Sequence, residues 1–354
     1  EDLYRDQNTW DRVVRSTHSA NCTGSCSWKV YVKDGVMLRE DGFVMDDGVV
    51  GRMAPDRFHI TTTTGGASRV LAIMEDYIQT EWPDLDVWLT STTEEWAVIA
   101  VQGPLSREVL GPLVEGIDLS REAMPHMSAR EGKICGVPTR LFRVSFTGEL
   151  GFEVNVPAGY GRAVWEAIYT AGQAHGITPY GTETMHVLRA EKGFIIVGQE
   201  TDGTVTLDDC GLGWAIGEAK KDFVGKRSLA RPAMMASDRK QLVGLLTVDP
   251  KTVLEEGAQV VADPNQLIPM TMLGHVTSSY WSATLDRSIA LALVRGGRAR
   301  IGTRLSVPMP DGPIAVELVK SGTTEPDAEL TKKLCAAAHQ SGVIVLSCGT
   351  FGNV

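Results

Sequence analysis

The chain has 354 residues, of which 43% are hydrophobic, and its formal net charge is −10. This length exceeds the roughly 100 to 200 residues of one typical domain, so two or three structural units are expected. The acidic balance argues against nucleic-acid binding, which needs clustered Lys and Arg to neutralise phosphates, whereas the longest basic cluster here is Lys220-Lys221.

The six cysteines are sparse and irregularly spaced for a chain of this length, so reduced thiols are expected rather than a disulfide framework. No continuous apolar run approaches the roughly 20 residues of a membrane-spanning helix, and the first residues do not resemble a signal peptide. We therefore expect a soluble cytoplasmic protein that binds no membrane.

The first two thirds of the chain mix predicted helices with predicted strands. Apolar side chains at helical spacing, with Pro83 and Gly176 as stop signals, predict helices over 66–81 and 157–176. A third helix is expected over 182–192. Thr182 is expected to cap the third helix, and Gly193 to end it in a left-handed conformation. Strands are expected at 87–89 and at 96–101, where a continuous apolar run suits a strand buried on both faces.

From Gln241 onward the pattern changes to short β segments separated by Gly, Pro and Asp. They are 242–248, 259–262, 274–278, 288–293, 305–307 and 314–318. Regular spacing of short strands predicts a small antiparallel barrel or sandwich, with a domain boundary near Arg239. In the tail, a helix from Pro326 to Gly342 and a strand at 343–346 are expected as an add-on unit, because about 35 residues cannot bury enough surface alone.

Two alternating strand-like runs in 142–156 are joined at Thr147-Gly148, and the second carries Glu153. The segment Phe-Thr-Gly-Glu-Leu-Gly-Phe-Glu at 146–153 resembles the Tyr/Phe-Thr-Gly-Glu-x-Gly-x-Glu hairpin of the folate-binding aminomethyltransferase fold. Three further landmarks of that family agree in order, at 41–47, 188–193 and 274–278. Within the family, residues 37–319 resemble the C-terminal folate-binding part of the heterotetrameric sarcosine oxidase α subunit.

The two ends of the chain resemble other families. Residues 4–36 are similar to the start of the respiratory nitrate reductase α subunit, and 320–354 to the end of a 4-aminobutyrate aminotransferase. These resemblances imply a composite α+β chain in which the aminomethyltransferase-like fold is truncated at its start. The expected parts are an N-terminal segment 1–36, a folate-binding region 37–239, a small β-barrel 240–319 and a helix-strand tail 320–354.

The resemblance implies that tetrahydrofolate captures a one-carbon unit from an amine-derived iminium, giving 5,10-methylenetetrahydrofolate. Such chemistry needs a carboxylate near folate N10 and a second acid that accepts hydrogen bonds from the pterin N–H edge. On matching positions Asp47 takes the first role and Glu153 the second. Alternation along an extended segment sends Asp46 and Asp47 to opposite faces, so only one can face the pocket. By spacing alone, a solvated turn is the better explanation of the two acids.

The resemblance places further folate-binding residues at Asp46, Phe146, Thr62, Thr64 and Arg189. Stand-alone aminomethyltransferases carry Tyr where this chain has Phe146, which can stack but has no hydroxyl to donate. Residue patterns leave other interpretations open: Thr62 and Thr64 suit an ordinary β-branched strand, and Arg189 suits a structural ion pair.

His18, Cys22 and Cys26 have ligands and spacing suited to an iron–sulfur cluster, which normally needs four ligands. One ligand is missing, so no cluster is expected. No Gly-x-Gly-x-x-Gly follows a predicted strand, and the tail lacks the lysine-bearing site of aminotransferases, so no FAD, NAD or pyridoxal phosphate site is expected. Oxidation of the amine would then require other sarcosine oxidase subunits. Two alternatives stay open, an iron–sulfur electron-transfer segment and a catalytically idle mosaic or scaffold.

Overall fold

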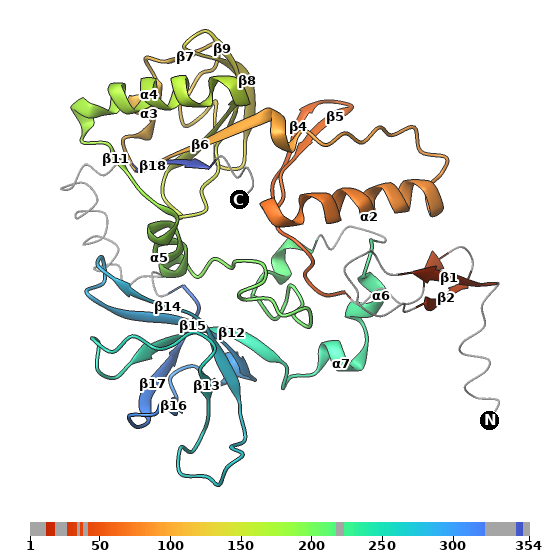
Figure 1. Cartoon of the computed structure of the whole chain (residues 1–354), viewed down its shortest axis with the longest axis vertical. Helices are drawn as coiled ribbons and strands as arrows, with labels where there is room; N and C mark the ends of the chain where they lie inside the picture. The colour runs from red at the N-terminus through yellow and green to blue at the C-terminus, as the bar shows by residue number, and fades with distance from the viewer. Residues whose placement is uncertain are drawn as a thin grey trace.

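The computed structural model describes residues 42–216 and 223–322 with their side chains. It also describes the backbone of four strands outside these ranges, namely β1 (Arg12–Thr17), β2 (Ser27–Lys33), β3 (Val36–Met37) and β18 (Val345–Gly349). The tail helix expected at 326–342 lies outside the described residues. Figure 1 shows a seven-stranded sheet covered by α3 and α4, a six-stranded sheet at the opposite end, and helix α5 between them.

The seven-stranded sheet has the order β11-β18-β6-β10-β9-β8-β7. Its strands other than β18 are β6 (Trp96–Gln102), β7 (Val114–Glu115), β8 (Ala129–Ile134), β9 (Val137–Phe142), β10 (Gly151–Pro157) and β11 (Thr178–Pro179). Alternate residues of β6 and β10, among them Ile99 and Val154, are fully buried against Val164 and Ile168 of α4 (Gly161–Gly172) and against α3 (Ser106–Leu110). Alternation sends the intervening residues, including Glu153, to the opposite face of the sheet.

A hairpin covers part of this opposite face. Its strands are β4 (Val50–Ala54) and β5 (Arg57–Ile60), and helix α2 (Ala67–Thr80) follows. The ring of His59 lies 5.8 Å from that of Trp96 and 5.7 Å from that of Phe142. A Cβ at Gly51 would lie only 2.6 Å from Phe142 Cε1. The hairpin can approach the sheet this closely because residue 51 has no side chain.

The six-stranded sheet closes into a barrel. Its strands are β12 (Lys240–Thr247), β13 (Gln259–Val260), β14 (Gly274–Ser282), β15 (Arg287–Arg295), β16 (Arg304–Val307) and β17 (Ile314–Val319). They follow the order β13-β14-β15-β12-β17-β16, and neighbouring strands are antiparallel. A bridge between Val261 and Ser306 joins the two edges of the sheet. The enclosed core includes Val243, Val276 and Leu318. Short helices α6 (Lys226–Leu229) and α7 (Pro232–Met235) precede the barrel.

Helix α5 (Thr182–Lys192) is bonded to this barrel through fully buried polar groups. The side chain of Arg189 is 0% exposed; its Nη1 donates to Glu200 at 2.8 Å and its Nη2 to Ser278 Oγ, on β14, at 2.6 Å. Ser278 in turn donates to the other oxygen of Glu200, so the network is closed on itself. A second bond runs from Ser282 Oγ to Glu191 at 2.6 Å.

Within the described residues, the structure confirms the helices predicted over 66–81, 157–176 and 182–192 and all six barrel strands, with small changes at their ends. The helix expected over 157–176 consists of α4 flanked by the 3-10 turns η4 (Ala158–Tyr160) and η5 (Gln173–His175), and Gly193 has the expected positive φ of 74°. The tail strand expected at 343–346 is β18, which pairs with β6 and with β11.

Five local predictions were wrong. No strand forms at 87–89, where Trp88 is 91% exposed and the chain has no partner strand. Gly181, not Thr182, occupies the N-cap position of α5, without a side-chain cap. The runs in 142–156 are joined by an irregular loop over 143–150 rather than a tight turn, and 42–49 is irregular rather than extended strand. Strand β6 is fully buried on only one face, since Val98 and Ala100 stay partly exposed.

In the described part of the chain, no helix combines the length and the apolar character needed to cross a membrane.

Candidate functional site

The two consecutive acids of the 42–49 segment have different surroundings. The carboxylate of Asp46 accepts hydrogen bonds from the backbone N–H of Asp47 at 2.8 Å, from the backbone N–H of Thr63 at 2.9 Å and from Thr63 Oγ1 at 3.0 Å. Gly66 leaves room for it, because a Cβ there would overlap Asp46 Oδ2. Asp46 therefore holds the turn η2 (Thr64–Gly66) that leads into α2.

Asp47 accepts one backbone hydrogen bond among the described residues, from the N–H of Gly48. Desolvation by the surrounding protein, with a smaller contribution from the charge of Asp46, raises the pKa of Asp47, although the residue as a whole stays accessible to solvent. The backbone N–H of Gly48 opposes this shift by bonding to the carboxyl. Because Asp46 occupies the local donors, the Asp47 carboxylate remains available for a ligand.

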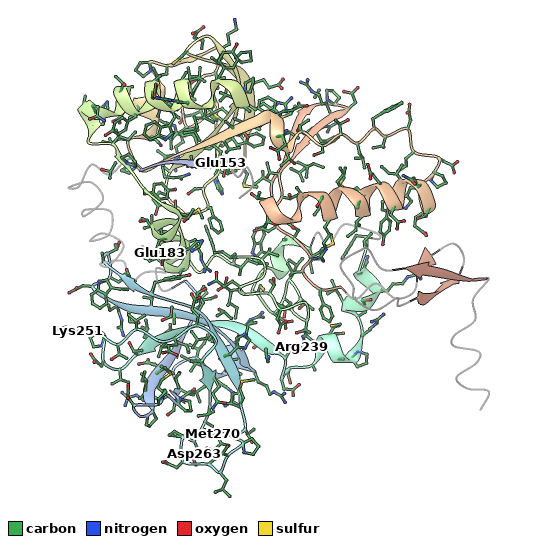
Figure 2. The ribbon with its side chains drawn as sticks, in the orientation of Figure 1. Glu153, Glu183, Arg239, Lys251, Asp263 and Met270 are labelled. Carbon is green, nitrogen blue, oxygen red and sulfur yellow. The ribbon has the colours of Figure 1, made fainter. Side chains whose placement is uncertain are left out.

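Glu153 lies on β10 between Ala100 of β6 and Phe142 of β9, on the face opposite α4. Figure 2 shows it on the side of the sheet that faces the middle of the molecule. The side chain is partly buried, and desolvation raises its pKa. Among the described residues no donor reaches its carboxylate within hydrogen-bond distance. A desolvated acid without a partner is unfavourable for folding, and such acids gather at functional sites.

More ionisable groups surround Glu153. Burial, followed by the charges of Glu149 and Glu153, raises the pKa of Tyr180 to about 12. Burial also raises the pKa of Glu149, whose Oε2 is buried without a partner in the described part of the protein, although Thr147 bonds to its side chain and Lys192 is nearby. We call Glu149, Glu153, Tyr180 and Glu191 the acidic cluster.

Three elements bring this cluster together. The loop 143–150 lies against α5, since a Cβ at Gly148 would be 2.5 Å from Lys192 Cγ. Glu191 of α5 is coupled to the charge of Glu149, and burial raises its pKa as well. Phe142, the cross-strand neighbour of Glu153, is contacted by the hairpin that begins three residues after Asp47. The sheet, the loop 143–150 and helix α5 thus direct these acids toward one region, and the β4–β5 hairpin packs on the same face of the sheet.

The other predicted folate-binding residues fall into two groups. Thr62 and Phe146 are partly buried and Thr64 is exposed at the start of η2, so these three lie beside the Asp46 turn or in the loop that carries Glu149. Arg189 is fully buried in its network with Glu200 and Ser278, which is the structural ion pair that the residue pattern left open. The assignment of these residues to folate binding stays a prediction.

The sequence alone did not single out Glu149 or Tyr180. Glu149 lies within the family motif at 146–153, so the motif could have indicated it. Tyr180 comes close to Glu153 only through the fold. His18, Cys22 and Cys26 lie outside the described residues. Within 42–216 and 223–322, no group of three or more His, Cys, Asp or Glu side chains is arranged to hold a metal ion.

Two family models match the chain. The GCVT N-terminal domain matches residues 22–220, and the glycine cleavage T-protein C-terminal barrel domain matches 240–323. A solved structure, the glycine cleavage system aminomethyltransferase T from Bartonella henselae, has a TM-score of 0.66 and 23% identity, covering 82% of this chain and 74% of that one. It shows that the fold is shared.

Curated relatives of the chain point to the same family. Sarcosine oxidase subunit alpha from Corynebacterium sp. (strain P-1) is 52% identical over 78% of this chain, and that from Rhizobium meliloti (strain 1021) is 44% identical over 77%. The chain spans only 29% and 28% of their lengths. Aminomethyltransferase from Clostridium botulinum (strain Loch Maree / Type A3) is 31% identical over 77% of this chain and 70% of its own length. The predicted α+β fold with a C-terminal barrel is confirmed, and the chain belongs to the glycine cleavage T-protein (aminomethyltransferase) family.

Proposed function

We propose that this chain is a tetrahydrofolate-binding module of the sarcosine oxidase α type, which forms 5,10-methylenetetrahydrofolate from an amine-derived iminium. The family membership and the 52% identity to a sarcosine oxidase α subunit support this choice. The main support for folate binding is that Glu153 is a partly buried, desolvated acid with no hydrogen-bond donor among the described residues.

A ligand with adjacent N–H groups would complete this arrangement. The pterin ring of tetrahydrofolate presents such an edge, and an ionised Glu153 would accept its hydrogen bonds. Phe146, in the adjoining loop, would offer a ring for stacking. Thr62 and Thr64 would line the same cleft near the Asp46 turn.

Asp47 would then act on the reacting nitrogen. When a folate nitrogen attacks the iminium carbon, a new C–N bond forms, the iminium π electrons return to the amine nitrogen, and the attacking nitrogen becomes positively charged. A nearby carboxylate stabilises that charge and accepts the proton as it leaves. Return of this proton to the amine nitrogen lets the carbon–amine bond break, and the amine departs. The second folate nitrogen then bonds to the same carbon and releases its own proton, which completes the five-membered ring of 5,10-methylenetetrahydrofolate. Its raised pKa brings Asp47 closer to the proton affinity that a general base needs near neutral pH.

The iminium would be produced by another protein component and not by this chain. We propose that flavin chemistry on another part of a sarcosine oxidase assembly produces it, and that this chain carries no FAD, NAD, pyridoxal phosphate or iron–sulfur site of its own. The partners would be folate, the iminium and other oxidase subunits, in the cytoplasm. We also propose that 1–36 and 320–354 derive from nitrate reductase-like and aminotransferase-like sequences, flanking a folate region 37–239 and a barrel 240–319.

The test is Asp47→Asn, which keeps the shape of the side chain and removes its charge. Loss of one preorganised charge should slow methylenetetrahydrofolate formation from formaldehyde and tetrahydrofolate by about 100-fold, with folate affinity changed far less. Stopped-flow rates, with the uncatalysed reaction subtracted, measure this. Asp56→Asn, an exposed acid at the β4–β5 turn, is the matched control. Equal rates for wild type and Asp47→Asn would refute the catalytic role.

A further inference from the structure

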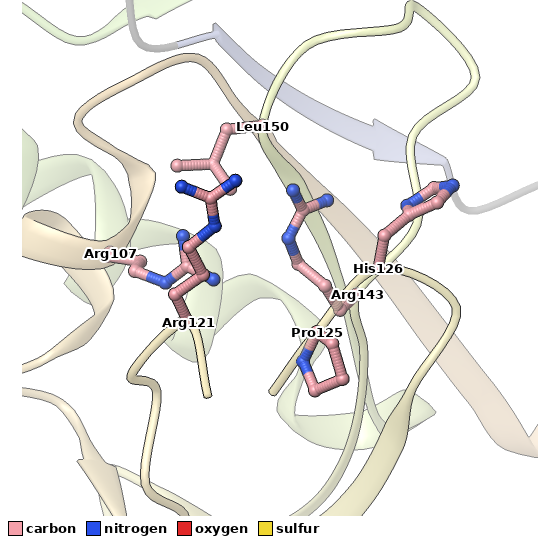
Figure 3. Close-up of a pocket in the computed structure, with 6 residues that line it drawn as sticks. All are labelled: Arg107, Arg121, Pro125, His126, Arg143 and Leu150. Atoms are coloured by element: carbon pink, nitrogen blue, oxygen red, sulfur yellow. The ribbon is translucent and has the colours of Figure 1, made fainter. Parts of the chain in front are cut away.

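A separate cavity of about 530 Å³ lies beside α3 at the end of the seven-stranded sheet where β10 begins. Its lining residues are Arg107, Arg121, Pro125, His126, Arg143 and Leu150. Figure 3 shows the three guanidinium groups gathered around the opening, and we call this cavity the arginine pocket. It shares no residue with the acidic cluster, and no carboxylate lines it.

Two of the arginines are fixed in place by neutral groups. Arg107 donates from Nε to the carbonyl of Leu119 at 2.6 Å and from Nη2 to that of Met124 at 3.3 Å, and Arg143 donates from Nη1 to Gly151 O at 3.2 Å. Both guanidinium groups lie over the ring of Phe152, at 5.5 and 5.6 Å from its centroid. These contacts orient the positive charges without neutralising them.

The charges stay uncompensated inside a protein of net charge −10. Elsewhere in the described residues, arginines such as Arg140, Arg239 and Arg298 pair with carboxylates, but no side-chain acid lies within 4 Å of Arg107, Arg121 or Arg143 in that part of the chain. Burial, and then the charge of Arg107, lowers the pKa of Arg143, and its Nε is buried without a partner in the described residues. The protein therefore holds like charges together at an energetic cost.

We propose that the arginine pocket binds a small polyanion that carries at least two phosphate or carboxylate groups. Guanidinium groups offer paired N–H donors that match the oxygens of either group. The volume falls within the roughly 300 to 1,000 Å³ of small-molecule sites, and it exceeds what one simple oxyanion fills. Arg121 and His126, both exposed, form the rim, while the partly buried Arg107 and Arg143 form the inner wall.

The experiment is calorimetric titration of the full chain at fixed ionic strength with two probes, inorganic pyrophosphate and citrate. Wild type should bind at least one of them saturably with one site per chain, and the preferred probe identifies the phosphate or the carboxylate class. Arg121→Gln should weaken that binding by about tenfold or more, because it removes one charge-assisted contact. Arg304→Gln, which removes an exposed arginine of the barrel strand β16, should leave it unchanged.

Arg121 has no hydrogen bond within the described residues that its loss would break, so Arg121→Gln should keep the thermal unfolding temperature of wild type. Arg143→Lys gives a second variant that retains the charge and loses the planar donor pair; it too should weaken binding. Saturable binding by wild type that is weakened by about tenfold or more in Arg121→Gln, weakened in Arg143→Lys and kept in Arg304→Gln supports the proposal. No saturable binding of either probe to wild type, or equal binding by wild type and Arg121→Gln, overturns it.

Discussion

Replacing Glu153 by Gln separates the role of its charge from the role of its shape. In the folded protein, desolvation holds the pKa of this carboxyl above its ordinary value of 4.5. Between these two pKa values the folded state binds more protons than the unfolded state, so stability falls as pH rises through that window. The penalty of the desolvated carboxylate therefore grows as pH rises above 4.5 toward the raised pKa. Glu153→Gln should therefore raise the unfolding temperature at pH 7 and change it little below pH 4.5.

Although Glu153→Gln should stabilise the folded protein, it should weaken ligand binding. A hydrogen bond to a charged group contributes about 1.5 to 3 kcal/mol, and 1.36 kcal/mol corresponds to a factor of ten. Glu153→Gln should thus weaken binding of 5-formyltetrahydrofolate by about 10- to 100-fold at neutral pH. Wild-type affinity should also fall as pH drops through the raised pKa, because the carboxylate becomes protonated, whereas affinity of the variant should stay flat over that window.

Calorimetric titration at several pH values and thermal unfolding without ligand measure both effects. Glu317→Gln, on the exposed face of β17, is the control for loss of a strand glutamate and should change neither. A Glu153→Gln protein that binds 5-formyltetrahydrofolate like wild type but unfolds at a lower temperature would show a purely structural carboxylate, and would refute the reasoning.

Two further changes test the framework of the site. Arg189→Met leaves Glu200 buried and unpaired, so the free energy of unfolding in urea should fall by about 3 to 5 kcal/mol. The control Arg162→Met breaks an exposed i,i+4 pair and should have little effect. A decrease below about 1 kcal/mol for Arg189→Met would contradict the importance of the network. Asp46→Ala removes the acceptor of three hydrogen bonds and should lower stability by about 1 to 2 kcal/mol and weaken folate binding, with partial rescue by Asp46→Asn. Wild-type stability and affinity in Asp46→Ala would show that the turn does not depend on this acid.

Local sequence patterns predicted the helices and barrel strands whose positions depend on neighbouring residues in the chain. Helices α2 and α4 carry apolar stripes and end before Pro83 and Gly176, α5 ends at Gly193, and the barrel strands are separated by turn residues, so their positions follow from residue order. The segment 87–89 failed because β-prone residues form a strand only when a partner strand is present, which no local pattern reveals.

The site was only partly predictable for the same reason. The motif at 146–153 indicated Glu153, and the family resemblance indicated Asp47. The different surroundings of Asp46 and Asp47 depend on Thr63, which lies 17 residues away from Asp46 in the chain. The nearness of Tyr180 to Glu153, and the convergence of Arg107, Arg121 and Arg143, likewise arise from tertiary packing and leave no local signal.

The bonds between α5 and β14 have a consequence for how this protein unfolds. Ser278 and Ser282 belong to the barrel, yet they are hydrogen-bonded to Arg189, Glu200 and Glu191 of the preceding region. If the barrel were to unfold first, these charged groups would lose partners while still enclosed by the rest of the protein. The barrel and the folate region should therefore melt in one cooperative transition, and a chain that ends at residue 239 should not retain a native first half. The barrel would thus act as an inseparable part of the folding unit, even though its sequence pattern looks like that of an independent domain.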